Sequence, residues 1–369
     1  MKKLLSLLLC VLLMVSMLAA CGKKDDSKKD DTTKTTASNA TTTTTTVTEK
    51  PNGTTLTSET VAETVKNSDG TESTTSKTEV ASSDGSKSTT TTDETGKVES
   101  EVKLTGNAVN QSNRKDEPVA LPLPPLPVTN STETAPTVTV DMPNGKKDGV
   151  VVEIPVENIS AGTVAVIVHP DGTEEVVKDS YVTADGLAVN LEGDATIKLV
   201  DNSKDFHDVS EDQWFHDAAD FMSARGLMSG TAEGQFSPDQ DSSRAMVWTM
   251  MASLDNHETT GGSTWYEKSQ NWAKESGVSD GTDPDGSIAR EQLAVMLWRQ
   301  AGSPVSSRSF DEFHDKDHIS GWAEEALRWA LENGIMGGKG NGVLDPKGNA
   351  SRGEVAQMFK NFVRYTAHN

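Results

Sequence analysis

Cysteine, aromatic side chains and basic charge are all scarce in this sequence, and each shortage excludes something. The only cysteines are Cys10 and Cys21, and aromatic residues make up 5% of the 369 residues. Cys10 lies in a removable N-terminal segment, so the mature chain can form no internal disulfide. The sequence has 34 lysines and arginines against 56 aspartates and glutamates, a net charge of −22. Because a phosphate backbone requires a basic face, a nucleic-acid partner is excluded.

Catalytic patterns are also missing from the sequence. It contains no Ser/His/Asp set, no glycine-rich phosphate loop and no convergent pair of carboxylates. We therefore predict no catalytic residue, no cofactor and no enzymatic activity. Asp283 to Ile288 imitates a calcium loop, but its first and twelfth positions would be Gly281 and Gln292. The pairs His207-Asp208 and His314-Asp315 recur at one position of a repeat, which favours a structural role over a metal site.

The N-terminus reads as a signal peptide over residues 1–20. Lys2 and Lys3 precede an apolar run from Leu4 to Leu18, and Leu18-Ala19-Ala20-Cys21 matches the bacterial lipobox. This motif predicts that Cys21 is lipidated and anchors the chain to a membrane. The alternatives are an ordinary cleavage site beside an incidental cysteine, or an uncleaved membrane helix.

Residues 21–135 are rich in Thr, Ser, Lys, Asp and Glu, and include an uninterrupted run from Thr41 to Thr46. Such a composition buries too little apolar surface to offset chain entropy, so we expect a long disordered linker. Pro118 to Pro127 should stiffen its end as polyproline II. A spacer that crosses a wall is a better explanation of this stretch than a docking site for a proline-reading domain.

A small β domain is expected over residues 136–202. Residues 150–154, 163–169 and 195–200 are strand-like, while Asp171-Gly172 and Asp185-Gly186 are typical of hairpin turns. A region of this size is near the lower limit for an independent core. We therefore expect a meander or small sandwich that leans on the segment that follows.

The last third of the chain repeats itself three times, over residues 203–256, 257–304 and 305–369. In each unit a tryptophan is followed twelve residues later by a glycine, and a proline stands six residues before an arginine. The tryptophans are Trp214, Trp265 and Trp322, and the arginines are Arg244, Arg290 and Arg352. Apolar spacing predicts a helix from each tryptophan, an αL cap at the glycine, and a second helix from each arginine.

These units resemble the S-layer homology (SLH) family. The openings Phe206-His207-Asp208-Val209 and Phe313-His314-Asp315 and the closing motif Ser351-Arg352-Gly353-Glu354 carry the resemblance, with Ser243-Arg244-Ala245-Met246 and Ala289-Arg290-Glu291-Gln292 as weaker copies. The middle unit lacks the opening and has a shorter loop. The resemblance implies a mainly α C-terminal domain of three helix-loop-helix repeats with pseudo-threefold symmetry. It also implies binding of an anionic secondary cell-wall polysaccharide, with pyruvate as a candidate acidic group, in grooves between the units.

The closing motif has a structural explanation beside the functional one. Ser351 and Glu354 form the pattern of a capping box, which needs no ligand. An arginine at the first helical position meets the positive end of the helix dipole and so calls for an anion. That anion is either an internal carboxylate or an external group held jointly by the arginine and free helix amides.

We therefore expect a non-catalytic envelope protein that tethers a lipid-anchored chain to the cell wall, on the extracellular face. The alternative is an accessory lipoprotein that localises an envelope hydrolase or another surface partner. A solute-binding lipoprotein is disfavoured because no bilobal α/β pattern is present. The tryptophans are either core residues or sugar platforms. The candidate polymer-binding residues are Arg244, Arg290, Arg352, Ser243, Ser351, Glu354, Trp214, Trp265, Trp322, Asp208 and Asp315.

Overall fold

The computed structural model describes residues 39–50, 53–67, 69–113, 117–143 and 149–367. Two sheets occupy the first part of this range and six α-helices the second. The strands are β1 (Asn39–Glu49), β2 (Thr55–Lys66), β3 (Glu72–Ser82), β4 (Lys87–Thr92), β5 (Val98–Lys103), β6 (Val119–Ala120), β7 (Thr137–Asp141), β8 (Val150–Pro155), β9 (Thr163–Val168), β10 (Glu174–Val176), β11 (Tyr181–Val182), β12 (Gly186–Leu191) and β13 (Ala195–Asp201), with helix α1 (Gly106–Asn113) between β5 and β6.

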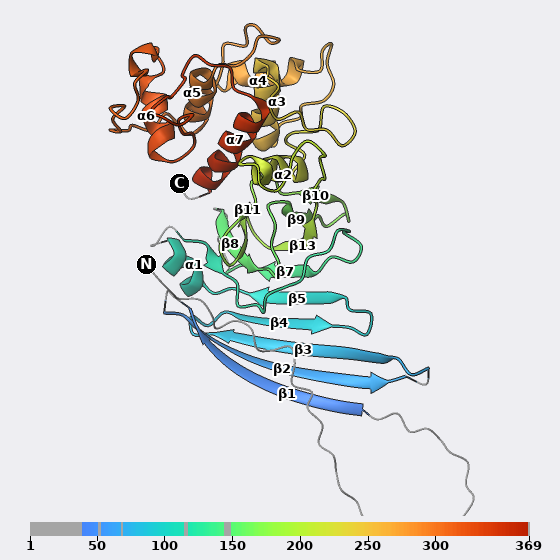
Figure 1. The fold of residues 1–369 in the computed structure, drawn as a ribbon. Helices are drawn as coiled ribbons and strands as arrows, with labels where there is room; N and C mark the ends of the chain where they lie inside the picture. The colour runs from blue at the N-terminus through green and yellow to red at the C-terminus, as the bar shows by residue number, and fades with distance from the viewer. Residues whose placement is uncertain (1–38, 51–52, 68, 114–116, 144–148, 368–369) are drawn as a thin grey trace, which may run out of the picture. The chain divides into compact units, whose positions relative to one another are not determined.

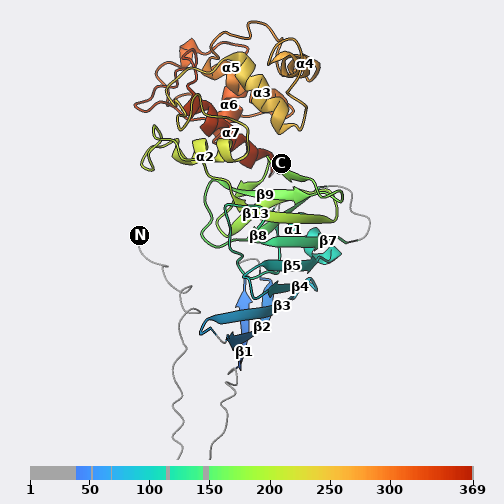
Figure 2. The same cartoon turned by 90° about the vertical axis from the view of Figure 1, so that its right-hand side faces the viewer.

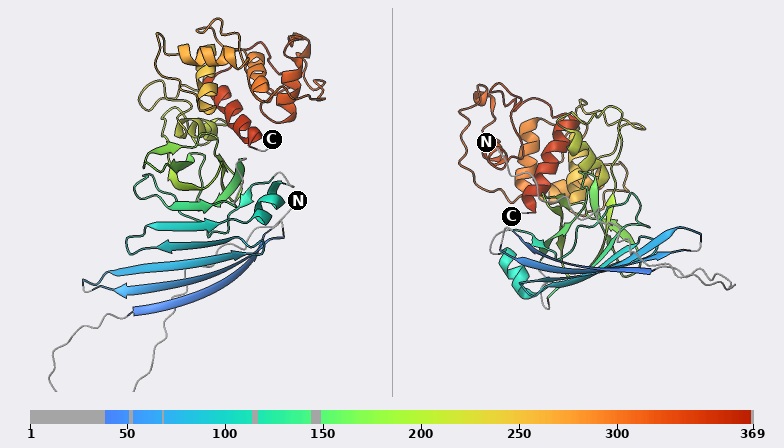
Figure 3. Two further views of the ribbon diagram at one scale, coloured as in Figure 1. Left: turned by 180° about the vertical axis from the view of Figure 1, so that it is seen from behind. Right: turned by 60° about the horizontal axis from the view of Figure 1, so that its bottom comes forward.

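The larger sheet has nine strands in the order β1-β2-β3-β4-β5-β7-β13-β9-β10, and the smaller has the order β11-β12-β8-β6. Strands β1 to β5 follow one another across the sheet in chain order as antiparallel neighbours (Figure 1). The ribbons of β1, β2 and β3 extend well past those of β4 and β5 (Figure 3). Strand β5 then pairs in parallel with β7.

The expected fold class, a mainly α domain after a small β domain and a disordered linker, is wrong. Residues 39–103 form five strands, and the chain as described is rich in β structure with a helical C-terminal part. Two features of this low-complexity segment favour β structure. Threonine is β-branched and favours strands, and Asp69-Gly70 and Asp84-Gly85 lie in hairpin turns, with both glycines at positive φ.

This polar segment is stabilised by the burial of one of its faces. Along β5 buried and exposed residues alternate strictly, and Val98 and Val102 enter a core shared with the smaller sheet. The cover over this face includes the proline-rich stretch that we expected to be a stiff spacer. Leu121 and Leu126 are buried there, and their N–H groups donate to the carbonyls of Glu153 and Pro155 at 2.9 and 3.0 Å.

The strands expected in the small β region are confirmed as β8, β9 and β13. The Asp171-Gly172 turn joins β9 to β10, and Asp185-Gly186 leads from β11 into β12. Tyr181 and Ala188 from the smaller sheet belong to the core of the helical part. The β region therefore packs against the helices.

The helices are α2 (His216–Ala224), α3 (Arg244–Leu254), α4 (Glu267–Glu275), α5 (Arg290–Gln300), α6 (Glu324–Glu332) and α7 (Arg352–Thr366), with a short 3-10 helix η1 (Lys316–His318). They gather in one bundle (Figure 2). Each repeat supplies two of them, as the spacing predicted. Gly226, Gly277 and Gly334 have φ of 65°, 75° and 65°, so the predicted αL caps are confirmed.

Arg225 ties the first repeat to the β region. Its guanidinium lies 3.8 Å from the ring centroid of Phe221 and donates to the carbonyls of Ser180, Ala161 and Thr163 at 2.9 to 3.1 Å. Burial lowers the pKa of Arg225 to about 9, which still leaves the group charged at neutral pH. The repeat pattern does not predict this contact, because the other repeats have Ser276 and Asn333 at the same position.

The signal peptide and Cys21 lie outside the described residues, so the predicted lipid anchor remains a prediction. Within the described ranges, no helix combines the length and apolar character needed to cross a membrane.

Candidate functional site

Three loops, one from each repeat, meet in a closed ring of backbone hydrogen bonds. The N–H of Ser242 donates to Ala350, that of Ala350 to Ile288, and that of Ile288 to Ser242, at 3.1, 2.8 and 2.9 Å. All three residues are buried. They stand at equivalent positions, two residues before each motif arginine, so the ring lies on the pseudo-threefold axis of the repeats.

The loops share an unusual backbone conformation as well. The residue just before the proline of each loop is Ser237, Asp283 or Asp345, and these have φ of 58°, 52° and 55°. Residues other than glycine rarely adopt this conformation, which costs on the order of 1 kcal/mol or more. Its recurrence in all three units shows that the middle unit is built like the other two at this point.

The ring places the start of each second helix against a neighbouring loop. The N–H groups of Arg244, Arg290 and Arg352 donate to the carbonyls of Gly286, Gly348 and Gln240 at 2.8 to 3.0 Å. The N–H group of the residue after each arginine donates to the carbonyl of the proline in the same neighbouring loop. These helix amides are therefore occupied, and an external anion cannot share them with the arginine.

The arginine side chains also reach the neighbouring unit. The Nε of each donates to the carbonyl two residues before the neighbour's proline: Thr282 for Arg244, Leu344 for Arg290 and Phe236 for Arg352, at 2.8, 3.2 and 2.8 Å. Of the two origins considered for the anionic partner, an internal carboxylate is present for two arginines. Arg244 pairs with Asp280 at 2.9 Å, and Arg290 pairs with Glu354 at 2.7 Å.

Arg352 differs from the other two. Among the described residues it forms no ion pair with a carboxylate; its Nη2 donates to the carbonyl of Ser229 at 2.6 Å and its guanidinium lies 4.9 Å from the ring centroid of Phe236. Burial lowers the pKa of Arg352, while the charge of Asp208 acts in the opposite direction. This guanidinium therefore keeps more of its positive charge uncompensated than the other two.

The capping box at the third motif is confirmed. The Ser351 hydroxyl accepts from the N–H of Glu354 at 3.3 Å, and the Glu354 carboxylate accepts from the N–H of Ser351 at 3.1 Å. The same carboxylate also pairs with Lys339 at 3.2 Å. At the first motif Ser243 accepts from the N–H of Met246 at 3.3 Å. Ser243, Ser351 and Glu354 thus have internal partners in this structure.

The three tryptophans are the largest exposed side chains of the repeats. Trp214, Trp265 and Trp322 are 61%, 55% and 58% exposed. Trp214 stacks edge-on against Phe215 and Trp265 against Tyr266, with ring centroids 5.2 and 5.4 Å apart. Of the two roles considered at the sequence level, exposure on this scale favours a platform over a core residue.

Each of two tryptophans can be placed beside the motif of the preceding unit. A Cβ added to Gly353 would lie 3.2 Å from the ring of Phe215, so the Trp214-Phe215 pair borders the Arg352 motif. The N–H and hydroxyl of Ser320 donate to Glu291 at 3.0 and 2.8 Å, which brings the turn that carries Trp322 to the Arg290 motif. At two junctions between units, the turn that carries an exposed indole therefore contacts the motif that carries an arginine.

Asp208 and Asp315 cap backbone turns. Asp208 accepts from the N–H groups of Phe236 and Ser237 at 2.8 and 2.7 Å, and Asp315 accepts from those of Leu344 and Asp345 at 2.9 and 2.8 Å. Burial alone would raise the pKa of both carboxyls, but these backbone donors lower it, and the net direction is downward.

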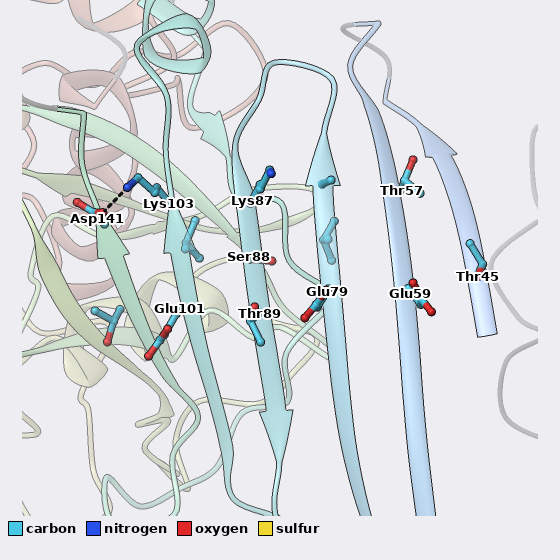
Figure 4. Close-up of a pocket in the computed structure, with 14 residues that line it drawn as sticks. Thr45, Thr57, Glu59, Glu79, Lys87, Ser88, Thr89, Glu101, Lys103 and Asp141 are labelled. Carbon is cyan, nitrogen blue, oxygen red and sulfur yellow. Dashed lines mark ion pairs between the residues drawn. The ribbon is translucent and has the colours of Figure 1, made fainter. Parts of the chain in front are cut away.

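A hollow of about 660 Å³ lies over the larger sheet (Figure 4). Glu59 lies opposite Glu79 there, and Lys87 lies opposite Lys103. Thr45 from β1 stands at its border. The lining carries carboxylates, ammonium groups, threonines and Ser88.

Comparison with known proteins agrees with the repeat pattern. The family profile of the S-layer homology domain matches residues 205–245 and 312–356. An SLH domain is therefore present, while the middle unit, which lies outside both matches, remains a predicted repeat.

Relatives of two kinds share this region. The chain is 27% identical over 173 residues to the S-layer protein sap of Bacillus anthracis. The aligned region covers 42% of this chain and 21% of that protein. It is 28% identical over 173 residues to an amylopullulanase of Thermoanaerobacterium thermosulfurigenes, and the aligned region covers 42% of this chain and 9% of that protein. It is 26% identical over 178 residues to the exoglucanase XynX of Acetivibrio thermocellus, and the aligned region covers 44% of this chain and 16% of that protein. The chain thus spans about a fifth or less of the length of these relatives.

The lowered pKa of Asp208 and Asp315 predicts how acid acts on the repeats. Their stabilising effect is complete above the usual aspartate pKa of about 3.9 and is lost as the pH falls through the lower folded value. We expect Asp208→Asn with Asp315→Asn to lower the unfolding free energy by about 2–4 kcal/mol at pH 7, and to lose less stability between pH 5 and pH 2 than the wild type.

Urea unfolding followed by circular dichroism at several pH values measures this difference. Asp239→Asn, at an exposed aspartate, is the matched control and should behave like the wild type at every pH. An acid loss in the double variant as large as that of the wild type would contradict the assignment.

Proposed function

We propose that this chain is a cell-surface protein that its SLH domain anchors to the cell wall, by binding an anionic secondary cell-wall polysaccharide at the junctions between repeats. The main supporting observation is that an exposed indole recurs in all three units, as Trp214, Trp265 and Trp322. The turns that carry Trp214 and Trp322 also contact the arginine motif of a neighbouring unit. The SLH matches and the similarity to S-layer proteins support the location at the cell surface.

Sugar binding follows from the chemistry of these junctions. A half-exposed indole offers a rigid apolar face on which the C–H face of a sugar ring can stack, at little cost in conformational entropy. The neighbouring arginine supplies charge-assisted hydrogen bonds to an acidic substituent, for which a pyruvate carboxylate is a candidate. Three junctions on one domain would bind a repeating polymer multivalently, so that weak single sites add to firm anchoring.

The three junctions should not bind the anion equally. Arg244 and Arg290 already pair with Asp280 and Glu354, so an external carboxylate would compete with an internal one. Arg352 makes no such pair among the described residues, and the next residue of its motif, Gly353, adjoins Phe215, the neighbour of Trp214. We propose that the junction between the third and first units is the principal anion site.

The lipid anchor completes the proposal. Cys21 in the lipobox would hold the N-terminus at a membrane while the repeats grip the wall, so that the chain tethers one to the other. We propose a non-catalytic role, because the region shared with the amylopullulanase and the exoglucanase is only the SLH-like part of this chain. Those same relatives favour the alternative, in which the repeats localise a hydrolase or another surface partner.

The tryptophans provide the cleanest test, because their exposure means that truncation leaves the core intact. We expect Trp214→Ala with Trp265→Ala and Trp322→Ala to weaken binding to purified sacculi at least about tenfold, since interfacial tryptophans often contribute 1–2 kcal/mol or more each. Co-sedimentation with native sacculi, and with sacculi stripped of secondary polymer by acid, measures the effect.

Val305→Ala is the matched control, because Val305 is an apolar side chain that is 91% exposed and belongs to none of the repeat motifs. It should bind like the wild type. Unchanged binding by a folded triple tryptophan variant, or equal binding to stripped sacculi, would contradict the proposal.

The ranking of the arginines is tested separately. We expect Arg352→Gln to weaken binding of a purified polymer fragment by about tenfold to a hundredfold, which corresponds to one charge-assisted hydrogen bond of about 1.5–3 kcal/mol. Arg290→Gln should lower stability, because it removes the ion pair between the buried Arg290 side chain and Glu354, but should change affinity less.

Calorimetry at a temperature where both variants are folded separates the two effects. Circular dichroism of the same samples verifies folding, since both guanidiniums are buried. An affinity loss for Arg290→Gln that equals the loss for Arg352→Gln would show that internal neutralisation does not decide which junction binds.

A further inference from the structure

Strand β1 is an open edge of unusual length. It pairs over all eleven of its residues, from Asn39 to Glu49, with β2 on one side, and it stands at the end of the strand order. Among the described residues no strand lies on its other side, so a row of backbone N–H and C=O groups faces outward. Such a row is a ready template for another strand.

The other sheet edges are protected, and β1 is not. Strand β10 has three residues, of which Glu174 and Glu175 are charged, and the edge strands β11 and β6 have two residues each. Short length and charge are the usual devices that keep an edge from pairing. Strand β1 instead carries a single charge, on Glu49, and has no proline, lysine or glycine.

Strand β1 is also poorly supported within its own chain. Residues 40–49 are exposed on both faces, including Val47 at 64%. Strand β2 is only partly buried. Outer strands without a packed face are marginal in water, so an added strand would complete the hydrogen bonding of β1 and cover part of its surface.

We propose that β1 pairs antiparallel with β1 of a second copy of this chain. A two-fold axis through Thr44 places Thr42 opposite Thr46 and leaves Glu49 opposite Asn39, so that no like charges meet across the interface. The same chain is therefore self-complementary at this edge. The sheet uses the same contacts internally, where hydroxyls of Thr60 and Thr78 lie 3.0 Å apart and those of Thr64 and Thr74 lie 3.1 Å apart.

The pairing closes on itself. Each copy has one unprotected edge, so two copies use both edges and form a dimer with two-fold symmetry, not a fibre. Neither the wall-binding junctions nor Cys21 takes part, and the proposal stands whether or not the repeats bind polymer. Anchoring both copies on one surface would raise their effective concentration and so favour the dimer.

Disulfide cross-linking of the full chain in cells tests the pairing and its register. In the paired strands Thr44 lies opposite itself, at a Cα separation of about 4.5–5.5 Å, which a disulfide can span. We expect Thr44→Cys to form a dimer on a non-reducing gel after mild oxidation. Cells that express Thr42→Cys and Thr46→Cys chains together should also give a dimer, and more of it than either chain alone.

Two controls exclude chance collision and Cys21. Val305→Cys, at a fully accessible position, and the wild-type chain should give little dimer. A second variant tests the edge without a thiol: Thr44→Lys places two lysines opposite each other and should abolish any dimer seen with the wild type by chemical cross-linking, while Val305→Lys should not.

Absence of a Thr44→Cys dimer, in a chain whose circular dichroism matches the wild type, would overturn the proposal and leave β1 to another occupant such as residues 22–38. Equal cross-linking at Val305→Cys, or no preference for the Thr42→Cys and Thr46→Cys combination, would overturn it as well.

Discussion

The ring of three backbone hydrogen bonds among Ser242, Ile288 and Ala350 is the constraint on which the helical part depends. Each loop donates to one neighbour and accepts from the other, so no unit can be removed without leaving a buried N–H and a buried carbonyl unpaired, at a cost of about 1–3 kcal/mol each. A single repeat has one apolar stripe and cannot bury it alone. The ring fixes how three such stripes face one another.

Everything that defines the candidate junctions follows from that ring. It sets the starts of α3, α5 and α7 against neighbouring loops, and so points each arginine into the next unit. The tryptophans lie at the start of the first helices, and contacts between units hold the turns of Trp214 and Trp322 beside a neighbouring motif. Exposed aromatic faces on a hydrogen-bonded backbone suit recognition of a sugar chain, since the protein loses little conformational entropy on binding.

The sequence predicted the helical part well and the β part poorly, for a physical reason. Fixed spacing located both helices of each unit, the glycine caps and the arginine starts, because helix punctuation is a local property. Strand pairing is not local: β5 pairs with β7 across the proline-rich stretch, and the low hydrophobicity of residues 39–103 concealed threonine strands and Asp-Gly turns. The internal acceptors of the arginines and the Arg225 contact depend on neighbours that no spacing reveals.

Covalent footprinting of the tryptophans tests the central claim most directly. Oxidative labelling of the full chain, quantified by mass spectrometry with and without purified secondary wall polymer, compares exposed and buried indoles in one sample. The account predicts that polymer protects Trp214, Trp265 and Trp322, while Trp248 and Trp329, which are fully buried, stay unlabelled in both states. Labelling of the three exposed tryptophans that remains unchanged when polymer is bound would contradict it.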